Sequence, residues 1–347
     1  EDTGDRPARS RRARGGRGRG GGGRGRGARD RDDEGRDDDV REDEPDEEDR
    51  VVEGTVELLG NGSGFVRVSP PEPSDDDVYV SAAQVRRCEL VAGDKVSGPV
   101  RRPRRSERFS SLIRVDTING RPADEVAEGT RYDDLPATFP TERFELAGDD
   151  VTLQAMAWLT PFGKGSRVTI AGGARAGKTE ALRRLAGALS AVDGLAVTVV
   201  LAGVRPEEVQ EWESGPVAPA AATTMAASGD AQAQAVEQAV EQARRLAARG
   251  GNAVVLIDSL DALSPGAARR ALAAARNLVD GGSLTIVATA AQPVGGETTT
   301  VVLHPGLAAA RRFPALDLAN SGTTRPELLV GEEGVEAIAR ARSETLG

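Results

Sequence analysis

Cysteine, histidine and aromatic residues are scarce in this chain, and each scarcity excludes a class of functional site. The single cysteine, Cys88, can form no internal disulfide and rules out a cysteine-rich zinc site. The single histidine, His304, rules out a metal site built from several histidines. Aromatic residues make up only 3% of the chain, so each well-placed ring carries more information than usual.

Long apolar runs are also absent from the sequence. No stretch reaches the roughly 18 apolar residues that a membrane-spanning helix needs, and no signal peptide opens the chain. We therefore expect a soluble, cytoplasmic protein with no membrane partner.

Charge is spread unevenly along the 347 residues, whose formal net charge is -10. Residues 6–29 are mainly arginine and glycine, and residues 30–49 are mainly aspartate and glutamate. Neither block has the apolar side chains to form a core, so we expect residues 1–50 to be a disordered tail. The arginine–glycine part is typical of tails that bind RNA and equally typical of solubilising linkers, and composition does not decide between them.

Residues 51–118 show the alternation of short strands separated by turns. The strands are expected over residues 51–58, 64–68, 77–81, 94–100 and 108–115. This pattern predicts a small β-barrel of the OB or cold-shock type.

Aromatic and arginine side chains share a face of this predicted barrel. Phe65 and Tyr79 fall on neighbouring strands, Arg67 is two residues from Phe65 on the same face, and Phe109 is on the last strand. Rings exposed beside arginines would form a surface on which RNA bases stack. The alternative is that the rings fill the barrel core, and the pattern alone leaves both interpretations open.

A strand–loop–helix pattern follows from residue 168. Residues 172–179 fit the motif G-x-x-x-x-G-K-[ST], between an apolar run at 168–171 and a helical pattern at 180–186. Backbone N–H groups of such a loop surround phosphate oxygens, while Lys178 would reach the β- and γ-phosphates and Thr179 would hold Mg²⁺. We interpret it as an ATP-binding P-loop rather than a glycine-rich turn with a chance lysine. The candidate nucleotide-binding residues are Gly172, Gly173, Ala174, Arg175, Ala176, Gly177, Lys178, Thr179 and Glu180.

Strand and helix patterns alternate over residues 151–330, which predicts a RecA-like α/β P-loop NTPase domain with a mainly parallel sheet. Strands are expected at 197–201, 253–258 and 283–288, and helices at 231–249 and 266–279. Asp258 ends the second of these strands, where a Walker B carboxylate binds Mg²⁺. An aspartate that caps a loop is the alternative, but the P-loop favours the metal ligand. Residues 119–150 are expected to be a linker.

The order of these motifs resembles that of the transcription termination factor Rho family, whose members are hexameric ATP-dependent RNA translocases. The matching segments in the predicted barrel are residues 62–67, 76–81, 84–87, 93–98 and 107–109. Those in the second domain are residues 161–165, 174–179, 205–209, 256–259, 274–277, 281–286 and 312–317.

This resemblance implies the residues that bind RNA and nucleotide, and the partners. The implied contacts to single-stranded RNA are Phe65, Arg67, Tyr79, Glu107, Arg108 and Phe109. Arg205 and Phe313 would join the nucleotide site, with Phe313 against the adenine. The chain would form a homo-oligomeric ring, or a mixed ring with a complete Rho, and work with RNA polymerase. Residues 331–347 correspond to a shortened C-terminal helical region.

The chain departs from the family at both catalytic positions. Val204 stands where the family has the glutamate that orients the attacking water. Thr324 stands where the family has the arginine that reaches a neighbouring subunit's phosphate, and Arg325 comes one position late. The two RNA-gripping channel loops are also missing, because residues 260–268 lead directly into a helix and residues 292–296 contain no lysine. No catalytic group of the family is intact, so we expect weak ATP hydrolysis.

Three functions are therefore open. The chain is an RNA-dependent ATPase and helicase that terminates transcription, or it is a catalytically impaired paralogue that binds RNA and nucleotide without translocating and modulates a complete Rho. A neutral relic of gene duplication is the third. A second, complete Rho in the same genome would favour the paralogue.

Overall fold

The computed structural model describes residues 50–69, 73–104, 107–127, 131–146, 148–279 and 281–346. The predicted tail over residues 1–50 lies outside the described residues apart from Arg50. Among the described residues, no helix is both long and apolar enough to cross a membrane.

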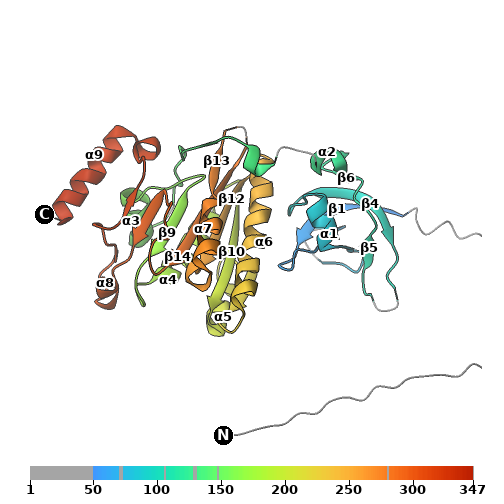
Figure 1. Ribbon diagram of the computed structural model, residues 1–347, viewed down its shortest axis with the longest axis horizontal. Helices are drawn as coiled ribbons and strands as arrows, with labels where there is room; N and C mark the ends of the chain where they lie inside the picture. The colour runs from blue at the N-terminus through green and yellow to red at the C-terminus, as the bar shows by residue number, and fades with distance from the viewer. Residues whose placement is uncertain are drawn as a thin grey trace, which may run out of the picture. The chain divides into compact units, whose positions relative to one another are not determined.

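The first domain is a barrel, as its alternating pattern predicts, and its neighbouring strands are antiparallel except for β3 and β5, which are parallel (Figure 1). Its main strands are β1 (Val51–Leu58), β2 (Gly64–Arg67), β3 (Val78–Val80), β4 (Lys95–Arg101) and β5 (Ser110–Leu112). They follow the order β1-β2-β3-β5-β4, and pairing of β1 with β4 closes the barrel. The short strands β6 (Thr117–Ile118) and β7 (Arg121–Pro122) extend the sheet beyond β4.

Alternate residues of these strands form the barrel core. Val52 and Val56 of β1, Val66 of β2, and Val78 and Val80 of β3 are all buried in one cluster. Helix α1 (Ala82–Arg87) follows β3 and begins with a capping box, which supplies hydrogen-bond partners for its first N–H groups.

The segment expected to be a linker, residues 119–150, contains several short elements. They are β7, α2 (Ala123–Ala127), the 3₁₀ turn η1 (Tyr132–Asp134) and β8 (Ala137–Thr138). Tyr132 is buried, and its hydroxyl donates to the carbonyl oxygen of Ala274 at 2.7 Å. Phe144 is buried in the core of the second domain. Residues 131–146 therefore pack onto the α/β domain.

The second domain has a mostly parallel sheet in the order β11-β10-β12-β14-β9-β15-β16. The strands are β9 (Arg167–Ala171), β10 (Leu195–Val204), β11 (Ala221–Thr224), β12 (Asn252–Asp258), β14 (Ser283–Ala290), β15 (Thr299–Val302) and β16 (Gly322–Thr323). All neighbours on this path are parallel except β15 and β16. Such a sheet with helices on both faces is the predicted P-loop NTPase fold.

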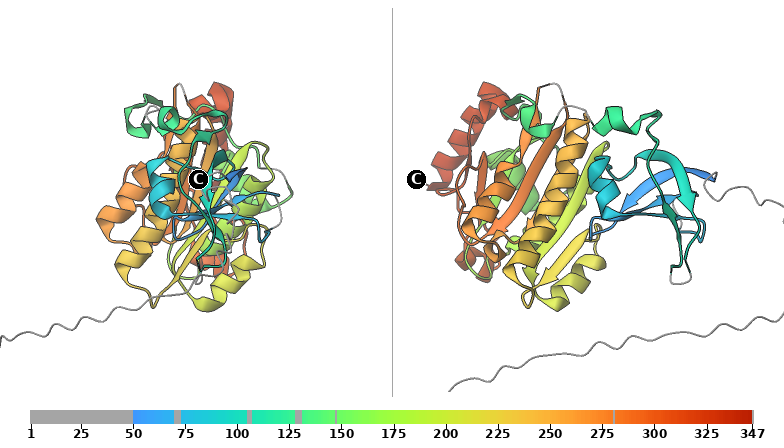
Figure 2. Two further views of the ribbon diagram at one scale, coloured as in Figure 1. Left: turned by 90° about the vertical axis from the view of Figure 1, so that its right-hand side faces the viewer. Right: turned by 45° about the vertical axis from the view of Figure 1, so that its right-hand side comes forward.

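Helices cover the two faces of this sheet (Figure 2). One face packs against α3 (Val151–Leu159), α4 (Lys178–Ser190) and α5 (Pro206–Glu213). The other face packs against α6 (Gly229–Ala248) and α7 (Pro265–Ala273), which lie side by side. The helix α8 (Pro305–Ala309) follows β15, and α9 (Glu327–Leu346), broken at Gly331, ends the described chain.

The helix expected over residues 266–279 is partly wrong. Helix α7 ends at Ala273, and β13 (Arg276–Leu278) pairs antiparallel with β14. The alanine-rich run carries a helical signal to its end, but residues 276–278 form a strand that pairs with β8 and with the first residues of β14, before the pairing of β14 with β9 begins. Tertiary pairing overrides local propensity here.

Candidate functional site

The P-loop lies between β9 and α4, as expected. Lys178 folds back over the loop, and its Nζ donates to the carbonyl oxygen of Gly172 at 2.6 Å. A Cβ atom on Gly172 would come within 2.7 Å of the backbone oxygen of Leu303, so this position requires glycine. The N-terminus of α4, a helix of 13 residues, adds free N–H groups and partial positive charge. The loop therefore has the geometry of a phosphate-binding site.

Asp258 ends β12 near this loop, with one carboxylate oxygen still unpaired. Thr289 on the neighbouring β14 donates to Asp258 Oδ1 at 2.6 Å, whereas Oδ2 is buried without a hydrogen-bond partner in the described residues. Burial raises the pKa of the Asp258 carboxyl above its ordinary value, and the hydroxyls of Thr289 and Thr179 oppose that shift. Mg²⁺ in nucleotide sites takes one or two carboxylates together with phosphate oxygens. The orphaned oxygen of Asp258, close to Thr179, fits this requirement.

Val204 and Arg205 lie where β10 leads into α5. The Val204 side chain is buried in the core on the α4 side and carries no group that accepts a proton. Arg205 donates to the Glu208 carboxylate from its backbone N–H and from Nη1, each at 2.9 Å. Burial is the main cause of the raised pKa of Asp258, and the negative charge of Glu208 raises it as well. The two carboxylates therefore interact electrostatically. Glu208 is thus engaged with Arg205 rather than free to hold a water.

Thr324 lies at the opposite end of the sheet. Its backbone N–H donates to the carbonyl oxygen of Thr298 at 2.7 Å, directly before β15 begins. The start of β15 pairs with the start of β9, whereas the P-loop follows the end of β9. Arg325 is turned onto its own chain: its guanidinium lies 5.7 Å from the ring centroid of Phe139 and forms an ion pair with Glu327.

Two other predicted nucleotide-site residues have different surroundings. Phe313 follows α8 and is 62% exposed. The carboxylate of Glu180 accepts hydrogen bonds from Arg183 at 2.8 Å and Arg184 at 2.7 Å. The Glu180 side chain is therefore bonded to its own helix, α4, and only the backbone N–H of Glu180 remains as a candidate phosphate contact.

The two connections expected to lack channel loops are short. Asp258 is followed by the 3₁₀ turn η2 (Leu260–Ala262) and then by α7. The connection from β14 to β15 is folded around Glu297, whose carboxylate accepts from the N–H groups of Val294 at 2.7 Å and Gly295 at 3.2 Å. Neither connection carries a lysine or arginine before α7 or β15 begins.

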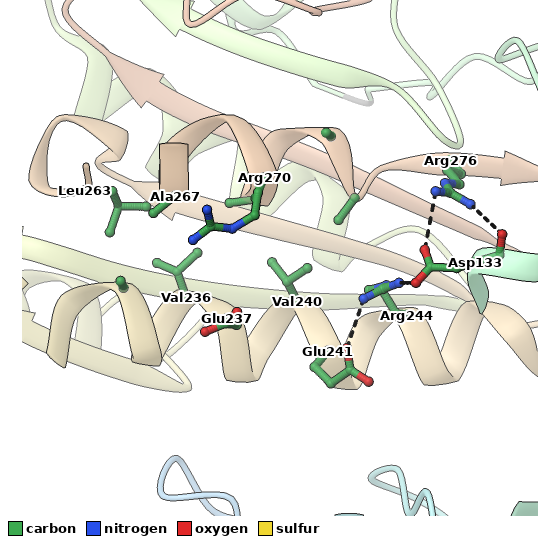
Figure 3. A pocket seen from close by; sticks show the side chains of 14 residues that line it. Asp133, Val236, Glu237, Val240, Glu241, Arg244, Leu263, Ala267, Arg270 and Arg276 are labelled. Carbon is green, nitrogen blue, oxygen red and sulfur yellow. Dashed lines mark hydrogen bonds and ion pairs between the residues drawn. The ribbon is translucent and has the colours of Figure 1, made fainter. Parts of the chain in front are cut away.

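A pocket of about 370 Å³ lies between α6 and α7 (Figure 3). Its floor includes Val236 and Val240, and its rim includes Arg244 and Arg276, which both form ion pairs with Asp133. None of the predicted nucleotide or RNA residues lines this pocket. The site predicted from the sequence is therefore a different one.

The rings of the barrel gather on its outer face. Phe65 pairs across strands with Tyr79, and Tyr79 pairs with Ser111 on β5. The centroid of Phe65 lies 5.8 Å from that of Tyr79 and 5.0 Å from that of Phe109, both in edge-to-face geometry. None of the three belongs to the barrel core, and Tyr79 is 36% exposed. We call Phe65, Tyr79 and Phe109 the aromatic platform.

Arg67 is held beside this platform by two carboxylates. Its guanidinium lies 2.5 Å from Glu57 and 2.5 Å from Asp77, and 5.3 Å from the centroid of Phe65. The hydrogen bond that Arg67 donates to Glu57 raises the pKa of Arg67 further, although burial opposes it. Burial alone would raise the pKa of Asp77, but hydrogen bonds from the Ser74 backbone and from Arg67 lower it below its ordinary value.

The loop between β4 and β5 brings Glu107 and Arg108 to the same face. Glu107 accepts from both terminal nitrogens of Arg101, at 2.8 and 3.0 Å, and this interaction lowers the pKa of Glu107 to about 2. Arg108 lies 5.1 Å from the centroid of Phe109 and forms an ion pair with Asp75 at 3.0 Å. Both predicted residues lie at the platform, but each is engaged with a partner of opposite charge.

Sequence reasoning missed the residues that hold the predicted ones in place. They are Glu57, Asp77 and Arg101 on the barrel, and Thr289 and Glu208 at the nucleotide site. These residues could not be identified without knowing which strands pair. Thr289 reaches Asp258 from the neighbouring strand, and Glu57 lies opposite Phe65 on the paired strand. A polar residue at the end of an apolar strand, such as Thr289, was the one signal available in the sequence.

Comparisons with known proteins give a consistent result. The sequence model of the family described as "Rho termination factor, RNA-binding domain" matches residues 52–124. The transcription termination factor Rho of Chromobacterium violaceum is 33% identical over 331 residues, which covers 82% of this chain and 79% of that protein. The Rho of Thermotoga maritima is 32% identical, with 82% of this chain and 76% of that protein covered. An ATPase of a bacterial type III secretion system has the same fold, with a TM-score of 0.50 and 20% identity over 60% of this chain and 70% of its own.

Proposed function

Because this chain belongs to the transcription termination factor Rho family, we propose that it acts in transcription termination by binding single-stranded RNA on the aromatic platform and ATP with Mg²⁺ at the P-loop. The gathering of three of the chain's few rings on the outer face of the barrel carries the proposal. Exposed rings offer stacking surfaces to bases, and stacking needs no fixed base sequence.

The nucleotide would be bound by the strand ends of the α/β sheet. The backbone of residues 172–179 would hold the phosphates, Lys178 would leave the Gly172 carbonyl to reach the β- and γ-phosphates, and Phe313 would cover the adenine. Asp258 and Thr179 would hold Mg²⁺, which neutralises phosphate charge when bound. Arg205 would also contact the nucleotide, once its guanidinium no longer donates to Glu208.

Hydrolysis by this site would be slow. Water attack on the γ-phosphate needs a group that orients the water and a cation that stabilises the transition state. Val204 supplies neither a proton acceptor nor a hydrogen-bond partner, and Thr324 carries no charge. Loss of an arginine finger alone costs about 10³–10⁵ in rate. We therefore favour a catalytically impaired member of the family over an efficient RNA-dependent helicase.

The remaining parts of the proposal concern assembly and partners. The chain would form a ring with its own copies, as a hexamer, or enter a mixed ring with a complete Rho and modulate it. RNA polymerase would be the larger partner, and the cytoplasm the place of action. The short connections after Asp258 and after β14 would leave the centre of such a ring without its RNA-gripping loops.

The test is a crossover between two variants of the full chain. Phe65→Ala should weaken binding of an oligocytidine RNA by about 1–3 kcal/mol, the value of one stacked base, and leave ATP–Mg²⁺ binding unchanged. Lys178→Ala should do the reverse, with Lys164→Ala as the matched lysine control because its Nζ is paired with Glu142. Fluorescence anisotropy would measure RNA binding, and calorimetry would measure nucleotide binding. If neither variant affects its own ligand, the assignment of both sites is wrong.

A further inference from the structure

The pocket between α6 and α7 is lined by none of the residues proposed to bind nucleotide or RNA, and its volume of about 370 Å³ is that of a small-molecule site. Helix α7 lines it with the small side chains of Ala267, Ala271 and Ala274, whereas α6 contributes Val236 and Val240 (Figure 3). Protein interiors are normally packed as densely as organic crystals, so a space of this size between two helices is an exception. The alanines leave room there for an apolar group of a ligand.

The charged residues at one end of this pocket are bound to one another. Asp133 forms ion pairs with Arg244 and with Arg276. Arg244 also pairs with Glu241, at 3.2 Å. The guanidinium carbons of the two arginines lie 5.0 and 5.4 Å from the centroid of the Tyr132 ring. These charges neutralise one another, so this end of the pocket offers little to a charged ligand.

Glu237 of α6 and Arg270 of α7 are the two lining charges that remain. Both side chains are exposed, so they stand at the open side of the pocket, one on each helix (Figure 3). Neither has a hydrogen bond or an ion pair to any residue within the described part of the chain. In an apolar pocket, a few polar groups at the edge fix the orientation of the ligand, because they pair with its own polar groups. A free cation and a free anion on the two walls match a molecule that carries both charges.

We propose that this pocket binds a free α-amino acid with an aliphatic side chain, whose carboxylate contacts Arg270 and whose ammonium group contacts Glu237. A guanidinium donates two parallel hydrogen bonds to a carboxylate, and an ammonium group donates to a carboxylate in the same charge-assisted way. The aliphatic side chain lies between the helices, against Val236 and Val240. Alanine has too little apolar surface to gain much from this burial, whereas leucine has enough. The site is independent of the functions proposed above.

Calorimetry on the full chain tests the proposal with L-leucine and two analogues that each lack one of its charges. Isocaproate is leucine without the ammonium group, and isoamylamine is leucine without the carboxylate. Arg270→Gln should weaken binding of L-leucine and of isocaproate about tenfold or more and leave that of isoamylamine unchanged. Glu237→Gln should weaken binding of L-leucine and of isoamylamine by a similar factor and leave that of isocaproate unchanged.

Two further variants serve as controls. Arg269→Gln removes the same charge from the adjacent position of α7, which is exposed and does not line the pocket, and should leave all binding unchanged. Ala267→Leu should exclude all three probes by filling the pocket, with thermal unfolding to show that the variant is folded. If Ala267→Leu is folded and still binds L-leucine, the pocket is not the site and the proposal is rejected.

The charge variants decide the proposal even if Ala267→Leu does not fold. If Arg269→Gln weakens L-leucine binding as much as Arg270→Gln does, the effect comes from net charge and the site is rejected. If Arg270→Gln and Glu237→Gln do not discriminate between isocaproate and isoamylamine, the assigned orientation is wrong and the proposal fails. If L-leucine does not bind the unmodified protein even at millimolar concentration, the pocket is a packing void only, and the proposal fails while the nucleotide and RNA sites stand.

Discussion

Thr324 and Lys178 lie at opposite ends of one sheet. Thr324 stands beside the start of β15, which pairs with the start of β9, whereas Lys178 begins the helix that follows the end of β9. β9 has five residues and alone spans about 17 Å. A side chain at position 324 therefore cannot reach phosphates held by the P-loop of its own chain. Any charge placed there must act on a neighbouring chain.

Restoring the two missing groups should raise the rate of hydrolysis and leave affinity unchanged. Val204→Glu with Thr324→Arg returns a water-orienting carboxylate and a transition-state cation, which act on the transition state rather than on bound ATP. In an assembled ring, kcat should rise by on the order of 10³, the lower range for an arginine finger. Steady-state turnover and calorimetry on the same sample would separate rate from affinity.

The control for this variant is Val204→Gln with Thr324→Arg, which has similar size at position 204 but no carboxylate. It should recover less of the rate than the glutamate does. An unchanged kcat in a double variant that light scattering shows to be assembled would contradict the roles assigned to positions 204 and 324.

Arg67→Ala should destabilise the barrel, because Asp77 would stay buried without its cation. The Asp77 side chain is fully buried and the Arg67 side chain is 12% exposed. Removal of one partner of a buried pair costs about 3 kcal/mol or more. Thermal unfolding of the full chain, with the transition of the barrel resolved, would measure the loss in the free energy of unfolding.

Removing both charges should restore part of that stability. The variant Arg67→Ala with Asp77→Asn leaves no buried charge, whereas Arg121→Ala, at an exposed pair, should change stability by less than about 0.5 kcal/mol. A double variant less stable than Arg67→Ala alone would show that the carboxylate of Asp77 is stabilised independently of Arg67.

Glu107 should titrate well below an ordinary glutamate. Its folded-state pKa of about 2 lies below the usual 4.5, first because of the hydrogen bond to Arg101. A depressed pKa means that the ion pair stabilises the loop fully above pH 4.5 and is lost as the pH falls toward 2. Carbon-detected NMR of the Glu107 carboxyl should give this midpoint, and Arg101→Gln should move it upward. An ordinary midpoint in the unmodified protein would mean that the pair does not persist in solution.

The backbone of the proposed nucleotide site could be predicted from the sequence because its motifs are local. The conformation of residues 172–179, and of the apolar strand that ends in Asp258, follows from the residues of each segment alone. A short stretch of sequence is therefore enough to predict it. The barrel strands follow from alternation in the same way. Alternation also places Phe65 and Tyr79 on a common face, but it does not say which face points inward. The buried neighbours Val66 and Val78 decide that in the structure.

Partners brought together by strand pairing could not be predicted. The contact between Asp258 and Thr289 depends on β12 lying beside β14, and the contact between Arg67 and Glu57 depends on the pairing of β1 with β2. The end of α7 depends on the same kind of information, since pairing with β14 and β8 makes residues 276–278 a strand. These contacts are determined by which strands pair and in which register, and no local sequence pattern contains that information.

The central claim is that this chain binds nucleotide at a site that hydrolyses it poorly. Steady-state ATP turnover by the unmodified protein, with and without polycytidine RNA and at saturating ATP–Mg²⁺, tests it most directly. We predict turnover far below about 1 s⁻¹, the lower end of ordinary enzyme rates, with or without RNA. RNA-stimulated turnover at or above about 1 s⁻¹ would contradict the claim, and Glu208, beside Arg205 and Asp258, would then be the first carboxylate to examine as the group that orients the water.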